Sequence, residues 1–572
     1  MLSTLLFLGA VGLQRPWDLR GYSGDGLALL TERSQAYGYV HTERFLAQVA
    51  QADGDQTLTA AVARWSAQLW GTDEQTLYYV DMHRKPVYAE VRLPRGLIGR
   101  TGKVLGCRAL ALLNDEAGHP LMAITDRGDT HLTHAFPRLM EGYHQAIAEQ
   151  SIQMVVLDRE GMGAEFLHSL AGVCEVTTLL RSNQYQGEAS FIDVGPFSPL
   201  TVDEEGNVTR EVAAARFELK LPGESEKTIS LAVALLRDWS RLTLDEPVEG
   251  TPASWEEPRW REEAYVAAPI QASAKTAKLI PIVSTAESVE VVDLVADYKR
   301  RWPAQENIIR DFLIPLGWET NHGYAKTAVE NSEVARRRQA WQTQLDHVRR
   351  WHANALLKSD RAGKLYRRRW QKAKVRGDEL YRQLNQEQSE LESADIPWYQ
   401  VTRHIKEKQA IIDAELEQMW TMAHKAYHNS NREWVKACNY SRKERQLLQQ
   451  LADLNSQEKQ MYELDNRKDQ IMTILRVALT NLIMWTRDQF FSQTYARATW
   501  KRLAPFFRLP GIVIDEADKC LVYLRSFNDN QLNRDLDAMC DRVNAAQPCL
   551  PDGRYLQFVR HQFASPITDM PP

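Results

Sequence analysis

The sequence contains few cysteines and no pattern among them. Its six cysteines are scattered along 572 residues, with no CxxC pair and no histidine spaced as a partner for zinc. A disulfide framework needs a much higher density of cysteines, and a structural zinc site needs closely spaced ligands. These absences argue against a disulfide-stapled secreted domain and favour a reducing compartment, so we expect a cytoplasmic protein.

An apolar run long enough to cross a membrane is also missing. The run MLSTLLFLGAVGL covers residues 1–13, whereas a membrane helix needs roughly 20 apolar residues. No basic residue precedes the run, and the following QRPWDLRGY is not a small-residue cleavage site of a secretory signal. We expect a buried helix here and no membrane partner.

The sequence has no large excess of acidic or basic residues. The formal net charge is −5, and the content of 44% hydrophobic and 25% charged residues is ordinary for a soluble protein. This balance argues against a basic coat over the whole surface, but a local basic surface is compatible with it. The length exceeds what one hydrophobic core supports, so several domains are expected.

Changes in periodicity and composition divide the chain into six segments. The predicted class is an α+β core with helical regions on both sides, and its element order is strand, strand, strand, helix, strand, helix, strand. The expected segments are a helical N-terminal segment (1–74), the first part of the core (75–182), a β-rich insertion (183–275), the second part of the core with a long helix (276–325), a basic helical hairpin or coiled coil with its corner at Pro397 (326–464), and a C-terminal helical domain (465–572).

Three acidic residues lie where these elements could bring them to one edge of a sheet. Asp81 belongs to the strand-like LYYVDMH, Asp158 ends the strand-like MVVLD, and Glu306 lies in the helix-like RRWPAQENIIRDF. Two such charges 4 Å apart repel by about 4 kcal/mol at an effective dielectric constant of 20, so the cluster needs protons or hard cations. Oxygen ligands suit Mg²⁺ or Mn²⁺, and a pair of ions supports phosphoryl transfer.

Each of these residues also has a purely structural interpretation. Asp158 precedes a helix and could be its N-cap, and Glu306 taken alone resembles an ordinary residue on a helix surface. His83 lies two residues after Asp81 on the same strand face, where a hydrogen-bonded polar neighbour is a better interpretation than a metal ligand. The ordered set of three carboxylates is the specific signal.

The segments YVDMH, VLDREGMG and YKRRWPAQENIIRDF resemble the DDE transposases of the IS4-like group, and the resemblance covers residues 75–320. It implies an RNase H-like core in which two aspartates and one glutamate bind the metal, with a β-rich insertion before the glutamate. On this resemblance Asp81, Asp158 and Glu306 are catalytic residues that bind two Mg²⁺ or Mn²⁺ ions. The implied activity is cleavage at transposon ends and strand transfer into target DNA, by a homodimer assembled on DNA.

The sequence departs from the group at its glutamate motif, Tyr-x-x-Arg-x-x-x-Glu. Tyr298 and Arg301 match and would contact DNA near the site, but Gln305 stands at the position of the glutamate and Glu306 follows it. Glu306 remains the expected ligand because an amide is a poor ligand for a hard cation. The later lysine of the group falls on Leu313, so no lysine is assigned.

The region 334–377 is rich in basic residues, with tryptophan and tyrosine interleaved and few acidic residues. Such a stretch favours binding to DNA phosphates, and the alternative is a solvated face of a paired helix. The residues expected to bind DNA here are Arg336, Arg337, Arg338, Arg349, Arg350, Arg367, Arg368, Arg369, Lys372 and Lys374. Two other functions remain open: a metal-dependent nuclease that does not join DNA, and a non-catalytic scaffold derived from a transposase.

Overall fold

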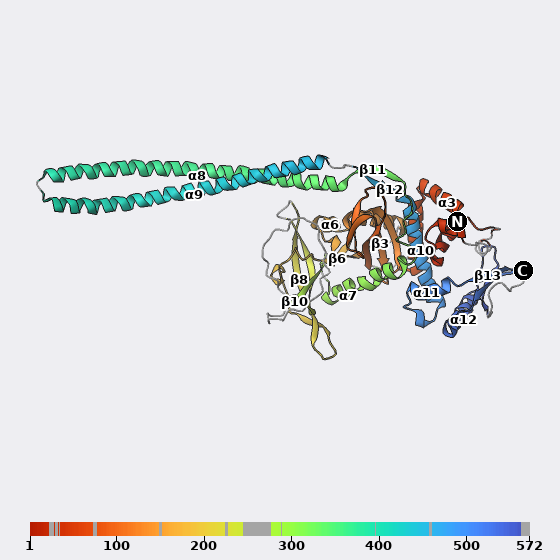
Figure 1. Ribbon diagram of the computed structural model, residues 1–572. Helices are drawn as coiled ribbons and strands as arrows, with labels where there is room; N and C mark the ends of the chain where they lie inside the picture. Colours follow the sequence, from red (N-terminus) through yellow and green to blue (C-terminus); the bar gives the residue numbers. More distant parts are fainter. Residues whose placement is uncertain are drawn as a thin grey trace. The chain divides into compact units, whose positions relative to one another are not determined.

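The structure is a computed structural model that describes residues 1–21, 28, 33, 35–72, 77–147, 152–222, 227–243, 276–287, 289–394, 396–456 and 460–561. It divides into two compact units, one formed by Met1–Thr327 with Tyr462–Pro572 and the other by Ala328–Met461. The predicted mixture of α and β structure is confirmed, because one large mixed sheet and many helices are present (Figure 1).

The first unit is built on a sheet of 10 strands in the order β2-β3-β1-β5-β6-β10-β9-β8-β7, with β4 also paired to β3. β1 is antiparallel to β3, whereas β5 runs parallel to both β1 and β6. The strands are β1 (Leu77–Pro86), β2 (Arg95–Ile98), β3 (Lys103–Asp115), β4 (Pro120–Arg127), β5 (Met154–Leu157), β6 (Glu175–Leu179), β7 (Ser198–Val202), β8 (Val208–Lys220), β9 (Thr228–Thr243) and β10 (Thr276–Ser284).

The described part of the predicted β-rich insertion, 183–275, forms strands that extend the core sheet, because β9 pairs with β10 and β10 pairs with β6. The sequence KPVYAEVRL (85–93) predicts a strand, but the stretch 87–93 has no strand structure. It lies between Pro86 and Pro94, and proline cannot donate a hydrogen bond to a neighbouring strand. Residues 244–275 lie outside the described part.

Helices cover both faces of the sheet. On one face α5 (Leu132–Ile147) and α6 (Ala164–Ser169) pack on the even-numbered side chains of β1, such as Tyr78 and Val80. On the other face α10 (Arg467–Phe490) packs on β3 and β4 through Ile474. No helix in the described ranges is both long and apolar enough to cross a membrane.

The N-terminal helices pack against α10. They are α1 (Leu2–Val11), the 3₁₀ helix η1 (Pro16–Gly21), α3 (Tyr39–Gln51) and α4 (Gly54–Trp70). Leu5 and Leu8 of α1 are fully buried in a cluster with Ile471 and Leu475 of α10. The prediction of a buried helix in residues 1–13 is therefore confirmed.

The C-terminal region corrects the prediction of a wholly helical domain. Besides α11 (Trp500–Phe507) and α12 (Asn530–Ala545), it contains β13 (Gly511–Asp515), β14 (Lys519–Arg525) and β15 (Tyr555–His561). β14 pairs with both other strands, so the three form a small sheet. Their runs GIVID and KCLVYLR are rich in β-branched and aromatic residues, which favour strands.

The second unit consists of two long antiparallel helices, α8 (Ser332–Ser393) and α9 (Trp398–Ser456). α9 begins directly after Pro397, as the sequence predicts for the hairpin corner. Midway along the pair, the hydroxyls of Ser359 and Ser430 each donate to the backbone carbonyl of the other residue, at 3.0 and 2.9 Å. β11 (Lys326–Glu330) and β12 (Gln460–Leu464) pair with each other where the chain enters and leaves this unit.

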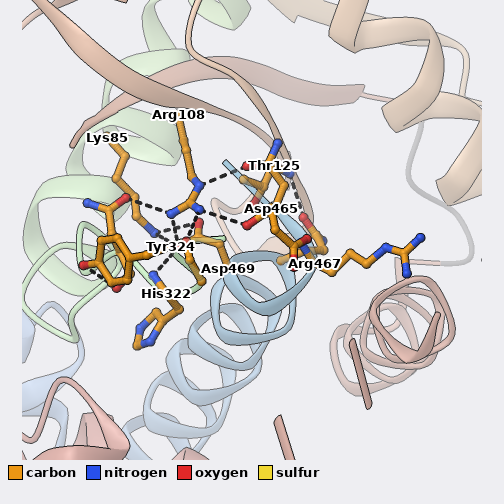
Figure 2. A network of polar contacts seen from close by, with 12 residues as sticks. Lys85, Arg108, Thr125, His322, Tyr324, Asp465, Arg467 and Asp469 are labelled. Atoms are coloured by element: carbon orange, nitrogen blue, oxygen red, sulfur yellow. Dashed lines mark hydrogen bonds and ion pairs between the residues drawn. The ribbon is translucent and has the colours of Figure 1, made fainter. Parts of the chain in front are cut away.

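A buried network of charged side chains fastens the two chain segments that flank the hairpin to the core sheet (Figure 2). The Nζ atom of Lys85 lies 2.8 Å from both carboxylate oxygens of Asp469, and Nη1 of Arg108 donates to the same carboxylate at 3.2 Å. Arg108 also donates to the backbone carbonyls of Gly323 and Asp465, at 2.6 and 3.0 Å. Strands β1 and β3 are thereby joined to the start of α10.

Candidate active site

The pairing of β1 with β5 brings Asp81 and Asp158 side by side. Tyr79 and Val156 are register partners, and both pack on Ala304 at one face of the sheet. Asp81 and Asp158 each lie two residues further along, and Asp158 keeps an extended backbone with φ −68° and ψ 164°. Because side chains alternate along a strand and paired strands lie about 4.8 Å apart, both carboxylates reach the face that carries Ala304.

A long helix crosses this face and delivers Glu306. It consists of α7 (Val291–Arg301) followed by two π-helical turns, η5 (Trp302–Glu306) and η6 (Ile309–Leu313). The hydroxyl of Tyr79 donates to the carbonyl of Asp297 at 3.1 Å. At the β3–β4 turn, a Cβ on Gly118 would lie 2.9 Å from the backbone of Ala304, so the turn packs closely on the helix.

Pro303 accounts for the π-helical turn. Proline has no N–H to donate to the carbonyl four residues earlier, and its ring would clash with that carbonyl in an α-helix. Here the carbonyl of Lys299 accepts instead from the N–H of Trp302, and the N–H of Asn307 reaches back five residues to Trp302. A π turn of this kind accommodates one more residue than an α turn.

The extra residue explains the offset between Gln305 and Glu306. Residues four apart share a face of an α-helix, but in the π turn the side chain that faces Arg301 is five residues away. Nη2 of Arg301 donates to Oε1 of Glu306 at 2.7 Å. Glu306 therefore faces the arginine, as the glutamate one position earlier would do in a regular helix.

Gln305 has a separate structural role that the sequence did not reveal. Its side chain is fully buried. With the amide oxygen turned toward β1, it accepts from the backbone N–H groups of Asp81, at 2.7 Å, and Val80, at 3.3 Å. Gln305 thus holds the backbone of Asp81, which lies one residue beyond the last β1–β5 pair. In the sequence, Pro303 was the signal that the helical register changes at this point.

Arg301 is a cation that all three carboxylates share. This buried guanidinium interacts electrostatically with Asp81, Asp158 and Glu306. Burial raises the pKa values of Asp81 and Glu306, Arg301 opposes the rise, and the neighbouring carboxylates add to it. With all three groups ionised, one guanidinium cannot balance them, so the site attracts additional positive charge.

Tyr298 lies beside the same group of residues. The guanidinium of Arg301 is 5.7 Å from the centre of its ring. Burial raises the pKa of Tyr298 to about 12, and Asp158 also raises this pKa, against the effect of Arg301. The phenol is therefore neutral near pH 7 and able to donate a hydrogen bond.

The structure also tests the purely structural interpretations of individual residues that the sequence left open. Asp158 occupies the N-cap position of the 3₁₀ helix η3 (Arg159–Gly161), but its side chain makes no capping hydrogen bond. His83 lies 3.2 Å from a carboxylate oxygen of Glu319 and stacks on Trp318, which confirms its interpretation as a hydrogen-bonded polar residue. Leu313 is completely buried in the core.

The donor chemistry of the site fits a hard cation, although the ligands are not assembled around one. Within the described ranges, no group of three or more His, Cys, Asp or Glu side chains is arranged to hold a metal ion. One reason is visible: the carboxylate of Glu306 is engaged by Arg301. Asp81, Asp158 and Glu306 would hold Mg²⁺ or Mn²⁺ through oxygen atoms alone, as these ions prefer.

The other residues expected to bind DNA lie on α8, in the second unit. Some are used within the hairpin: Arg349 pairs with Glu444 at 2.9 Å, and Arg369 donates to the carbonyl of Met422 at 3.0 Å. Further contacts engage Arg338 with Glu330, Arg350 with the carbonyl of Asp346, and Lys374 with the ring of Trp370. The other five, Arg336, Arg337, Arg367, Arg368 and Lys372, are exposed, and the last three of them line an open hollow on the helix surface.

Comparison with family models finds no match for this chain, and comparison with curated proteins finds no significant one.

Proposed function

We propose that this chain is a DNA transposase that cleaves transposon ends and transfers them into target DNA, with Asp81, Asp158 and Glu306 as its metal-binding catalytic residues. The observation that carries the proposal is the convergence of these three carboxylates on Arg301 from elements far apart in the sequence. A cluster of this kind is unfavourable unless it serves to bind cations or protons.

The topology of the sheet supports an RNase H-like core. Along the chain β1, β3 and β4 are followed by α5, β5, α6 and β6, which is the expected alternation of strands and helices apart from the short β2. In space the order is β4-β3-β1-β5-β6, with β1 at the centre. Asp81 lies on β1 and Asp158 directly follows the adjacent β5, and the described strands β7 to β9 lie between Asp158 and Glu306 in the sequence.

In this proposal the residues of the site have different roles in the reaction. Two bound Mg²⁺ ions would supply charge stabilisation for the attacking and leaving oxygens of phosphoryl transfer. Asp81 and Asp158 are fixed by their strands, whereas Glu306 is held by Arg301. Release of Glu306 would complete the set of oxygen ligands and free the guanidinium to donate to a DNA phosphate.

The second unit supplies a surface for DNA in this proposal. Buried positions of α8 recur at spacings of three, seven and four residues at Leu345, Val348, Ala355 and Ser359, which supports a coiled coil with α9. Its exposed arginines and lysine would neutralise phosphates. A transposase that joins two transposon ends is expected to act as a homodimer on DNA.

The test is strand transfer of an end-containing DNA duplex in Mg²⁺, with wild type, Asp158→Ala and Asp293→Ala compared. Asp293 is an exposed acidic residue on α7, so its variant is the matched control. We expect joined products from wild type and the control alone. Cleavage without joining would favour the nuclease, and DNA binding without cleavage by any variant would favour the scaffold. Equal activity of wild type and Asp158→Ala would refute the catalytic assignment.

A further inference from the structure

One side of the long hairpin formed by α8 and α9 (Figure 1) carries large apolar side chains that are open to solvent. The buried residues of α9 that face α8 fit a single heptad repeat, and they are Leu416, Ala423, Ala426, Ala437, Leu447 and Leu454. Beside this seam, a second series on α9 has the same spacing of seven residues and consists of Trp420, Tyr427, Trp434, Ser441 and Leu448. Three of its members, Tyr427, Trp434 and Leu448, are 48%, 53% and 43% exposed. A row of apolar side chains therefore lies on the surface of the hairpin.

The first helix of the hairpin contributes to the same side. The rings of Trp370 on α8 and Trp420 on α9 lie 6.2 Å apart. Leu356 precedes Trp370 by two heptads, and the two side chains are 38% and 37% exposed. Gly363 lies midway between them, and a Cβ there would be 3.4 Å from the hydroxyl of Ser430, so the two helices approach closely. The apolar stripe of the hairpin thus consists of Leu356, Trp370, Trp420, Tyr427, Trp434 and Leu448.

An acidic and a basic residue border the apolar stripe at one level of the hairpin. Arg349 of α8 donates to Glu444 of α9 at 2.9 Å, so these two residues lie side by side. Asp346 precedes Arg349 by three residues, and Arg445 directly follows Glu444. Both bordering residues are exposed. Each lies three residues before a position of the seven-residue series that forms the stripe, which makes it a neighbour of the stripe on the helix surface.

A basic and an acidic residue border the stripe at a second level, where the neighbouring rings are those of Trp370 and Trp420. Lys374 follows Trp370 by four residues, with its Nζ atom 5.3 Å from the centre of that ring. Glu417 precedes Trp420 by three residues. Both charged side chains are exposed. The margin on α8 is therefore acidic at the first level and basic at the second, and the margin on α9 has the opposite order.

These four charges make the stripe complementary to itself. A second copy that turns its stripe onto the first by a two-fold rotation brings each charge opposite one of its neighbours around the stripe, and neighbouring charges differ in sign. An antiparallel copy would pair Asp346 with Lys374 and Glu417 with Arg445. A parallel copy would pair Asp346 with Arg445 and Lys374 with Glu417. In either orientation, opposite charges surround an apolar centre, which is the usual anatomy of a protein interface.

The stripe is separate from the proposed DNA surface. No residue of the stripe is among those that line the open hollow on α8. Arg367 does line the hollow and lies three residues before Trp370, where the two surfaces meet. Between Asp346 and Arg367 on the same margin, Asp360 is paired with Lys364 of its own helix at 2.7 Å. The charge of Asp360 is therefore balanced within each copy.

We propose that the apolar stripe is the interface with a second copy of this chain, whose own stripe packs on it so that the two hairpins form a four-helix bundle. Tryptophan and tyrosine are the residues that contribute most to binding energy at interfaces, and exposed apolar patches mark such surfaces. The alternating charges at the margin select a second copy over an unrelated protein. The dimer forms without DNA and does not depend on the proposed activity.

The first experiment measures the mass of the full chain by sedimentation equilibrium without DNA. We expect wild type to be a dimer that dissociates on dilution. Leu356→Glu/Trp434→Glu should raise the dissociation constant at least about a hundredfold, because dimerisation would bury unpaired carboxylates. The matched control is Leu357→Glu/Val435→Glu, whose residues directly follow the two tested ones and are 56% and 51% exposed. The control should dimerise like wild type.

Two results of this experiment would overturn the proposal. One is a wild type that is monomeric at every concentration, which would leave the stripe to a different protein. The other is an equal dissociation constant for the two double variants, because the dimer would then use another surface. Far-ultraviolet circular dichroism shows whether both double variants keep their helices.

Exchange of charges tests the margin of the interface and determines the orientation of the two copies. Glu417→Lys and Arg445→Glu should each weaken the dimer about tenfold, because each change is present in both copies and creates repulsion. In an antiparallel dimer, the combined variant Glu417→Lys/Arg445→Glu recovers the affinity of wild type. In a parallel dimer the combination weakens the dimer further, since Lys374 and Asp346 then face like charges. Single variants that dimerise as tightly as wild type would contradict the proposal, and they decide the question should the stripe variant fail to fold.

These measurements use neither DNA nor metal, so their outcome is independent of the strand-transfer test. A chain that dimerises through the stripe but transfers no strands would support the interface and refute the transposase. A chain that transfers strands but is monomeric without DNA would support the transposase and refute the interface.

Discussion

Arg301 and Glu306, five residues apart on one helix, are joined by a hydrogen bond of 2.7 Å. The π-helical turn Trp302–Glu306 makes this contact possible, because it places residues five apart on one face. The same turn directs Gln305 to the backbone of β1. Because of the one extra residue in the helix, Glu306 belongs to the carboxylate cluster, whereas Gln305 supports the fold.

Exchange of the two side chains tests this register. In Gln305→Glu/Glu306→Gln the carboxylate moves to the position that the family motif predicts, but the π turn would bury it against the N–H groups of Val80 and Asp81. We expect cleavage of DNA in Mg²⁺ to fall by at least about a hundredfold, as for Glu306→Gln alone. Asp293→Asn, on the same helix, should cleave normally. Retention of wild-type cleavage by the exchanged variant would show that the helix register is regular.

Asp81 should lower the stability of the fold at neutral pH. Burial raises its pKa above the ordinary value of 3.8, so the folded chain binds this proton more tightly than the unfolded chain. The protonated carboxyl therefore adds to the free energy of unfolding. This stabilisation is complete below the unfolded pKa and is lost as pH rises through the folded pKa. Asp81→Asn is therefore expected to have a higher Tm than wild type at pH 7 and to lose DNA cleavage. In calorimetry the increase in Tm of Asp81→Asn over wild type should disappear toward pH 4. An increase in Tm that is independent of pH would contradict this account.

The contribution of Asp469 to the stability of the fold should depend on pH in the opposite direction. Burial alone would raise its pKa, but Lys85 and Arg108 outweigh that effect and hold the pKa below 3.8. Its contribution to stability is therefore present above the unfolded pKa and is lost as pH falls through the folded pKa. Urea unfolding of Asp469→Asn at pH 7 should show a loss of about 3–5 kcal/mol, because buried cations are left without their partner. The difference from wild type should shrink below pH 4; if it stayed constant, the ion pairs would not be its source.

The exposed basic residues of α8 should govern the salt dependence of DNA binding. Replacement of Arg367, Arg368 and Lys372 by glutamine should lower affinity and reduce the slope of log K against log salt by about 0.9 for each DNA phosphate that the variant no longer neutralises. The control replaces Lys406, Lys425 and Lys443 on α9, which are also exposed. Fluorescence anisotropy at several salt concentrations measures both slopes. Equal slopes for the two triple variants would remove α8 as the specific DNA surface.

The aspartates of the candidate site could be located from the sequence because strand signals are local. Asp81 and Asp158 follow apolar runs that form β1 and β5, and the pairing of two parallel strands then brings them together. The hairpin was visible for the same reason, since long helical periodicity and Pro397 mark its two helices and its corner. The RNase H-like assignment remains a proposal.

Other features depend on contacts between distant segments and leave weaker signals. The π turn changes the helical spacing that sequence reasoning assumes, so the role of Gln305 could not be read from its position. Lys85 and Asp469 are 384 residues apart, and their ion pair forms only when β1 meets α10. The strands of the C-terminal sheet are short and lie among helical patterns, which is why that sheet was not predicted.

The most direct test of the central claim is a titration of the chain with Mn²⁺, followed by electron paramagnetic resonance of the free ion. It requires neither a known DNA sequence nor turnover. We expect wild type and Asp293→Asn to take up Mn²⁺, and Asp158→Asn to lose that uptake, because Asp81, Asp158 and Glu306 bind the ion together. Uptake of Mn²⁺ by Asp158→Asn equal to that of wild type would contradict the assignment of these carboxylates as a metal centre.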